Sequence, residues 1–195
     1  MVRSLNDRSP IPVIPMDGFR VPQTLTPNEL GDTLARLVWE SFSDFMANGD
    51  AEASPEELGM ATEDGLPPGH LAEEALIFFM WAHTRGTQLA FVGRAEDPLI
   101  RGGLDSLHEA IFHDMTEQGT PASQLPLFEA RVGARYAEYN QAASESDGDL
   151  SRAALRHLTG GGAETPEQAT AVLDRALAVA SPLKDFLEEV QLVEA

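Results

Sequence analysis

The sequence predicts an all-α protein: a bundle of five to six helices around a buried central helix, with an extended proline-rich N-terminal arm. Two observations predict this class. Apolar residues recur at steps of three and four along most of the chain, which is the period of an amphipathic helix. No alternating run of four or more residues rich in Val, Ile and Thr appears, so the sequence predicts no strand.

The composition limits the classes of protein to which this chain can belong. Its 195 residues, 43% of them hydrophobic and 23% charged, are typical of one ordinary globular domain. The chain has no cysteine, which excludes disulfides, thiol nucleophiles and iron–sulfur clusters. Its 32 acidic and 13 basic residues give a formal charge of -19, which disfavours binding to nucleic acid.

Residues 1–25 are predicted to form the extended arm. Four prolines in this segment exclude a helix and a central strand: Pro10, Pro12, Pro15 and Pro22. The apolar residues between them favour an arm docked on the same chain or on a neighbour. The prolines also interrupt any signal-peptide core, so we expect a cytoplasmic protein. The most apolar run, residues 75–82, is far shorter than the roughly 20 residues of a membrane span.

A capping box opens the first predicted helix. Thr26 and Glu29 stand three residues apart, and Pro27 between them suits the first helical position. An apolar stripe at steps of three to four follows: Leu30, Leu34, Leu37 or Val38, Phe42 and Phe45. Gly49 ends this helix. Residues 50–70 are acidic and contain three prolines, which predicts a loop with one short turn of helix.

Residues 71–92 are predicted to form the buried central helix. Their first three turns carry apolar side chains on every side, which is typical of a helix enclosed by others. Three more helices are expected: one after Pro98, one over residues 122–144, and one capped by Asp149 that ends at Leu158. The apolar stripes of the first two are Leu104, Leu107, Ile111 and Met115, and Phe128, Val132, Tyr136 and Tyr139.

Gly160–Gly162 separate a helical domain of residues 26–159 from a C-terminal segment of residues 163–195. They favour a hinge over a phosphate cradle, because no lysine follows and Glu164 would repel the ligand. A second capping box opens the C-terminal helix, and apolar residues then alternate at steps of four and three: Val172, Ala176, Val179, Leu183, Phe186, Val190 and Val193. Pro182 leaves open one kinked helix or two, packed on the same domain or on a partner.

The central helix holds the candidate ligand site. His83 follows its most apolar turns, where a polar group must find a partner or water. A pocket there would have Trp81 as its floor and a small anion bound by Arg85. Gln88 would be a further polar contact. The sequence favours the alternative that the helix simply reaches the surface beyond Ala82.

Two other histidines suggest metal binding less directly. Asp105 precedes His108 by three residues, and Glu109 precedes His113 by four, spacings shared by ordinary exposed helical pairs. The chain has no Glu-x-x-His motif of a di-iron bundle, no nucleophile elbow, no Walker A loop and no dinucleotide fingerprint. We therefore predict no metal, no cofactor and no catalytic residue.

These observations predict a non-catalytic accessory or adaptor protein that self-associates and has no nucleic-acid or membrane partner. Its interface would consist of five residues of the C-terminal seam: Val172, Val179, Leu183, Phe186 and Val190. The alternative is a helical protein, or an enzyme, that binds a small ligand or a metal. It would use His83 and Arg85, or His108 and His113. A third hypothesis, an acidic inhibitor of a basic protein, rests on charge alone.

Overall fold

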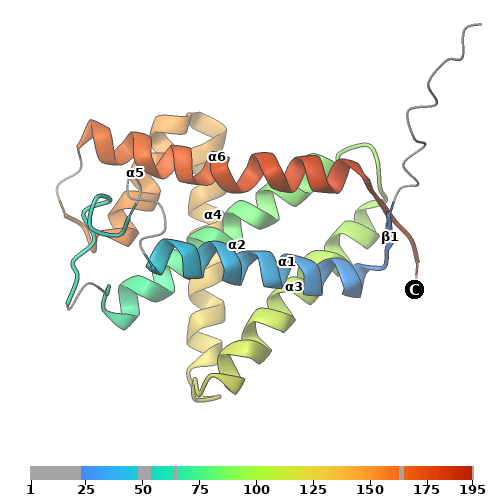
Figure 1. The fold of residues 1–195 in the computed structure, drawn as a ribbon, viewed down its shortest axis with the longest axis horizontal. Helices are drawn as coiled ribbons and strands as arrows, with labels where there is room; N and C mark the ends of the chain where they lie inside the picture. Colours follow the sequence, from blue (N-terminus) through green and yellow to red (C-terminus); the bar gives the residue numbers. More distant parts are fainter. Residues whose placement is uncertain (1–22, 48–53, 64–65, 163–164, 195) are drawn as a thin grey trace, which may run out of the picture.

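The computed structural model describes residues 23–47, 54–63, 66–162 and 165–194 (Figure 1). The predicted all-α class is confirmed, because this part of the chain forms six helices. They are α1 (Pro27–Met46), α2 (Gly69–Phe91), α3 (Asp97–Glu117), α4 (Leu125–Glu145), α5 (Asp147–Leu158) and α6 (Pro166–Glu188). The predicted N-terminal arm lies outside the described residues except for its last three. Within the described residues, no helix is long and apolar enough to span a membrane.

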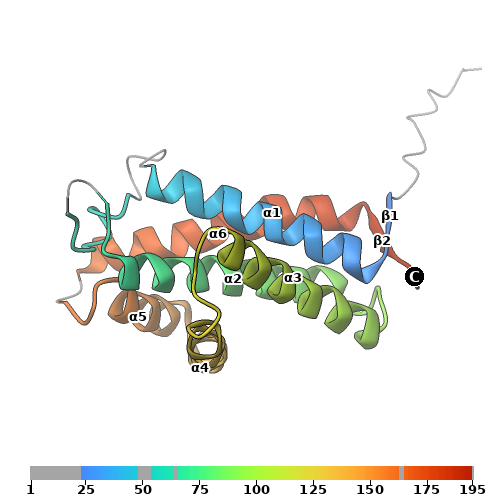
Figure 2. The ribbon, with the colours of Figure 1, turned by 90° about the horizontal axis from the view of Figure 1, so that it is seen from below.

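Helix α2 is the centre of the fold, as the sequence predicted. It contacts each of the other five helices, and 16 of its 23 residues are buried. Seen from below, α1 lies on one side of α2, and α4 and α5 lie on the other (Figure 2). A helix surrounded in this way must be apolar on every side, which is the pattern that its first turns carry.

Helix α1 begins with the predicted capping box. Thr26 accepts a hydrogen bond from the Glu29 amide, and the Glu29 carboxylate accepts one from the Thr26 amide. The helix packs closely along α3, because Gly31 brings its backbone against Ser106 and Leu107. Four residues of the predicted stripe are fully enclosed: Leu30, Leu34, Val38 and Phe45.

Helix α6 is one continuous helix with Pro182 inside it, which answers the question that the sequence left open. It runs antiparallel to α1, and both lie along α2 (Figure 1). It ends at Glu188, so the prediction that the helical seam continues to Val193 is wrong. Val190 instead begins a strand. Arg94 stabilises this end, because its guanidinium donates to the carbonyl oxygens of Leu187, Glu188 and Val190.

Two short strands correct the prediction of a strand-free chain. Strand β1 (Gln23–Leu25) pairs in parallel with β2 (Val190–Leu192), with Thr24 opposite Gln191. Each strand has three residues, too few to show an alternation of period two, and the partner lies at the other end of the chain. The pairing ties the start of α1 to the end of α6.

The caps and ends of the remaining helices differ slightly from the predicted ones. The cap of α5 is Ser146, whose hydroxyl accepts from the Asp149 amide, so the predicted cap at Asp149 is wrong. Gly160 and Gly161 end this helix with φ values of 67° and 87°, a left-handed conformation that glycine adopts without strain. The following segment folds back, and α6 packs against both α2 and α5.

Candidate functional site

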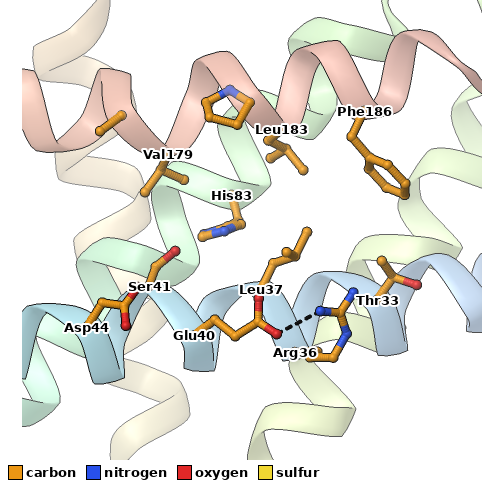
Figure 3. Close-up of a pocket in the computed structure, with 12 residues that line it drawn as sticks. Thr33, Arg36, Leu37, Glu40, Ser41, Asp44, His83, Val179, Leu183 and Phe186 are labelled. Carbon is orange, nitrogen blue, oxygen red and sulfur yellow. Dashed lines mark hydrogen bonds and ion pairs between the residues drawn. The ribbon is translucent and has the colours of Figure 1, made fainter. Parts of the chain in front are cut away.

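A cavity of about 400 Å³ lies between α1 and α6, and the His83 side chain of α2 enters it (Figure 3). We call it the α1/α6 groove. Helix α1 supplies its polar side, and α6 supplies a largely apolar wall. The lining consists of Thr33, Arg36, Leu37, Glu40, Ser41, Asp44, His83, Ala178, Val179, Pro182, Leu183 and Phe186.

His83 has a defined tautomer at the base of this groove. Its side chain is buried, and Nδ1 lies 2.8 Å from the carbonyl oxygen of Phe79, one turn earlier in α2. A carbonyl oxygen can only accept, so Nδ1 carries the proton. Burial lowers the pKa of His83, against the smaller opposing effect of the bond to Phe79. The ring is therefore neutral near pH 7, and Nε2 is a hydrogen-bond acceptor.

Nothing in the described part of the chain uses that acceptor. His83 Nε2 has no hydrogen-bond partner among the described residues. Nε2 is not one of the buried unpartnered atoms of the described residues, so it is open to the groove, where water or the N–H of a ligand can donate to it. This is the feature of the groove that points to a ligand.

The polar side of the groove is rich in acceptors. Arg36, the cation of the lining, is paired with Glu40 at 2.7 Å between Nη1 and Oε1, and both side chains are more than half exposed. Ser41 follows Glu40 directly on α1, and Asp44 lies one turn beyond Glu40 (Figure 3). Neither has a hydrogen-bond partner among the described residues. The groove thus presents a carboxylate, a hydroxyl and a neutral imidazole.

The facing wall is apolar. Val179 and Leu183 are buried, and Phe186 is half-buried at the end of the groove nearest the strands. Leu183 also packs on Gly86, where an added Cβ would stand only 3.0 Å from its Cδ2 atom. The base and wall of the groove are thereby fixed by the core.

The structure does not bring the four predicted ligand residues together. Trp81 is buried on another face of α2, where its indole donates to Asn140 at 3.0 Å. Arg85 and Gln88 are exposed, and Gln88 lines a different cavity, beside Phe91. At about 100° per residue, side chains two apart on a helix point in nearly opposite directions. His83 is the member of the set that lines the groove.

The predicted interface residues lie mostly inside the chain. Val172, Val179, Leu183 and Val190 are buried within the described part of this chain, and Phe186 is half-buried. The seam therefore packs on its own domain and not on a partner, one of the two possibilities that the sequence left open. Phe186, the half-buried one of the five, lines the α1/α6 groove.

His108 and His113 point in different directions. His108 Nε2 lies 3.0 Å from the Tyr136 hydroxyl, which lies 3.2 Å from Thr84 Oγ1. Burial lowers the pKa of His108 and raises that of Tyr136. His113 is exposed, beside Glu117. Within the described residues, no three His, Asp or Glu side chains are close enough to hold a metal ion.

Sequence reasoning singled out His83 but missed its neighbours on α1. Ser41 and Asp44 lie on the polar side of an amphipathic helix, where solvent-facing residues are expected, so their sequence carries no signal of a site.

Comparison of the chain with models of protein families, with curated proteins and with solved structures gives no significant match.

Proposed function

We propose that this chain is a binding protein for a small amine with an apolar body, held in the α1/α6 groove. The observation that carries the proposal is the neutral His83, whose Nε2 acceptor has no partner among the described residues. It supports the alternative hypothesis drawn from the sequence, in which His83 contributes to a ligand site. The other residues of the site now come from α1 and α6.

The charge of the groove selects the polar end of the ligand. Asp44 is a carboxylate without a partner in the described residues, and Asp44 and Glu40 against Arg36 give the lining a formal charge of -1. An ammonium group has three N–H donors, which match the acceptors that Asp44, Ser41 and His83 offer in the lining. A carboxylate would meet the acceptor Nε2 of His83 and would be repelled by Asp44.

The size and wall of the groove select the remainder of the ligand. A volume of about 400 Å³ lies in the range of small-molecule sites. Val179, Leu183 and Phe186 offer an apolar surface to an alkyl or aryl group. A short arylalkylamine therefore matches both sides of the groove.

Calorimetric titration with 4-phenylbutylamine, and separately with 4-phenylbutanoate, tests the proposal. The amine is expected to bind in a saturable, one-to-one manner, and the acid is not. Asp44→Asn should weaken amine binding about tenfold, or about 1.4 kcal/mol, because it removes the charge and keeps the shape. Asp32→Asn is the matched control, since Asp32 is another exposed aspartate of α1 and does not line the groove. Equal binding of amine and acid, or equal losses in the two variants, would contradict the proposal.

Three earlier predictions stay predictions. Self-association through the C-terminal seam now lacks support, because the seam is occupied by the chain itself. An adaptor role through another surface and a cytoplasmic location rest on the sequence arguments alone.

A further inference from the structure

Another cavity, of about 370 Å³, lies where the first turns of α2 meet α4, α5 and the turn that follows α5. These elements gather at one end of the molecule (Figure 1). We call it the arginine pocket. Its lining consists of His70, Leu71, Glu74, Arg131, Arg135, Arg156, His157, Gly160 and Gly161. With three arginines and one glutamate, the lining has a formal charge of +2 in a chain whose net charge is -19.

Buried and half-buried carboxylates hold the arginines in place. Glu74 is 7% exposed and accepts two hydrogen bonds from Arg135, at 2.8 and 2.9 Å. Arg131 pairs with Glu73 at 2.8 Å, and Arg156 donates to Glu138 at 3.1 Å. Glu73 and Glu138 do not line the cavity.

These pairs leave donors for a ligand. A guanidinium has five N–H donors in a planar fork, and each ion pair uses one or two of them. The arginines come from two helices, and Glu74 fixes the orientation of Arg135 before any ligand arrives, because it accepts two hydrogen bonds from it. Preorganised donors of this kind bind an oxyanion without the entropy cost of ordering long side chains.

The backbone around the pocket also suits an anion. The first turn of α2 carries no acidic side chain and no side-chain cap, so the positive end of this 23-residue helix is not neutralised. Gly160 and Gly161 add no side chain to the cavity, and a Cβ on Gly161 would meet no atom within 4 Å. These features add to the arginines and do not make a site alone.

The fold answers one of the two reasons for which the sequence disfavoured a phosphate at the glycines, the lack of a nearby cation. No lysine follows Gly160–Gly162 in the sequence, but α4 and α5 bring three arginines beside Gly160 and Gly161. Glu164, which would oppose an anion, lies outside the described residues.

We propose that the arginine pocket binds a phosphate group, either inorganic phosphate or the phosphate of a small monoester. The site is separate from the α1/α6 groove, with no lining residue in common. Its existence does not depend on the proposed amine binding.

Calorimetric titration of the full chain with inorganic phosphate, and separately with phenyl phosphate, tests this site. Both anions are expected to bind one to one, and chloride at the same ionic strength is not. A tenfold preference for phenyl phosphate would identify a monoester as the ligand, whereas equal affinities would identify phosphate itself. Absence of saturable binding by both anions would overturn the proposal.

Variants on α5 and α4 locate the site. Arg156→Gln should weaken phosphate binding at least tenfold and stay folded, because the Arg156 side chain is 58% exposed. Arg131→Gln should act in the same direction. Arg152→Gln is the matched control, since Arg152 is an equally exposed arginine of α5 that pairs with Asp149 and does not line the pocket. Equal weakening by Arg152→Gln would show that phosphate responds to net charge only, and the assignment would be wrong.

Discussion

His83 Nδ1 lies 2.8 Å from the carbonyl oxygen of Phe79, so the ring of a buried histidine is anchored to its own helix by one nitrogen. The other nitrogen, Nε2, faces no acceptor or donor of the described residues and belongs to a side chain that lines the α1/α6 groove. This relationship decides the protonation state of the ring and the kind of ligand that the groove can take.

Protein stability is expected to fall at acidic pH because of His83. Burial holds the pKa of His83 in the folded protein below the ordinary value of 6.5. As the pH falls, the unfolded chain therefore binds a proton on this residue that the folded chain excludes. This contribution is fully present above pH 6.5 and is lost as the pH falls toward the folded-state pKa. Between pH 7.5 and 5.5 it amounts to at most about 1.4 kcal/mol.

Urea unfolding at the two pH values measures this effect. His83→Gln should lose less stability on acidification than the wild type, because glutamine does not titrate. Three charged side chains of α1 line the groove with His83 and are unchanged in this variant: Arg36, Glu40 and Asp44. The lining residues of α6 carry no charge. His108 also has a lowered pKa and remains in both proteins. An unchanged pH dependence in His83→Gln would contradict a buried, neutral ring.

Truncation of Phe79 should be costly. The side chain is 1% exposed and packs edge-on against Phe45 and Phe78. Phe79→Ala removes these contacts and leaves a cavity in the centre of the fold, so a loss of about 3–5 kcal/mol is expected in denaturant unfolding. A loss below about 1 kcal/mol would show that α2 is peripheral.

A methyl group on Gly31 should push α1 away from α3. An added Cβ would stand 2.4 Å from the Ser106 Cβ and 2.8 Å from the Leu107 amide nitrogen, and backbone cannot move aside cheaply. Gly31→Ala is expected to cost about 1–3 kcal/mol. Gly133→Ala, a mid-helix control with no neighbour within 4 Å, should instead gain about 0.5–1 kcal/mol. Thermal unfolding of the two variants tests the close packing of α1 on α3. If this contact were loose, both variants would gain stability.

A charge in the seam of α6 should unfold the protein rather than split an oligomer. Leu183 is 4% exposed and lies against Gly86, so Leu183→Asp would bury a carboxylate without a partner. Leu177→Asp is the control on the same helix, because Leu177 is 53% exposed, and it should change stability by less than about 0.5 kcal/mol. Circular dichroism and light scattering measure the two outcomes. A folded Leu183→Asp of lower mass would restore the self-association hypothesis.

The sequence predicted the helices well because their signals are local. The stripe of Leu104, Leu107, Ile111 and Met115 in α3 repeats within one segment, and all four residues are buried. The two strands could not be predicted, since three residues show no period and the partner of Gln23, Val190, lies at the other end of the chain.

Of the residues that line the candidate site, the sequence singled out one. A histidine in an apolar helix is visible in the sequence, so His83 could be found. The partners of His83 in the groove come from α1 and α6, and only the packing of both helices on α2 brings them to it. The arginine pocket could not be predicted for the same reason. Arg131 and Arg156 lie on different helices, and each forms an ion pair of the kind that is common on protein surfaces.

Long-range ¹H–¹⁵N NMR of the His83 ring tests the central claim most directly, because it reports on both nitrogens with and without ligand. At pH 7.5 the account predicts a proton on Nδ1 and none on Nε2, and a shift of the Nε2 signal alone as 4-phenylbutylamine saturates the protein. A proton on Nε2 in the free protein, or an Nε2 signal that does not respond to the amine, would contradict it.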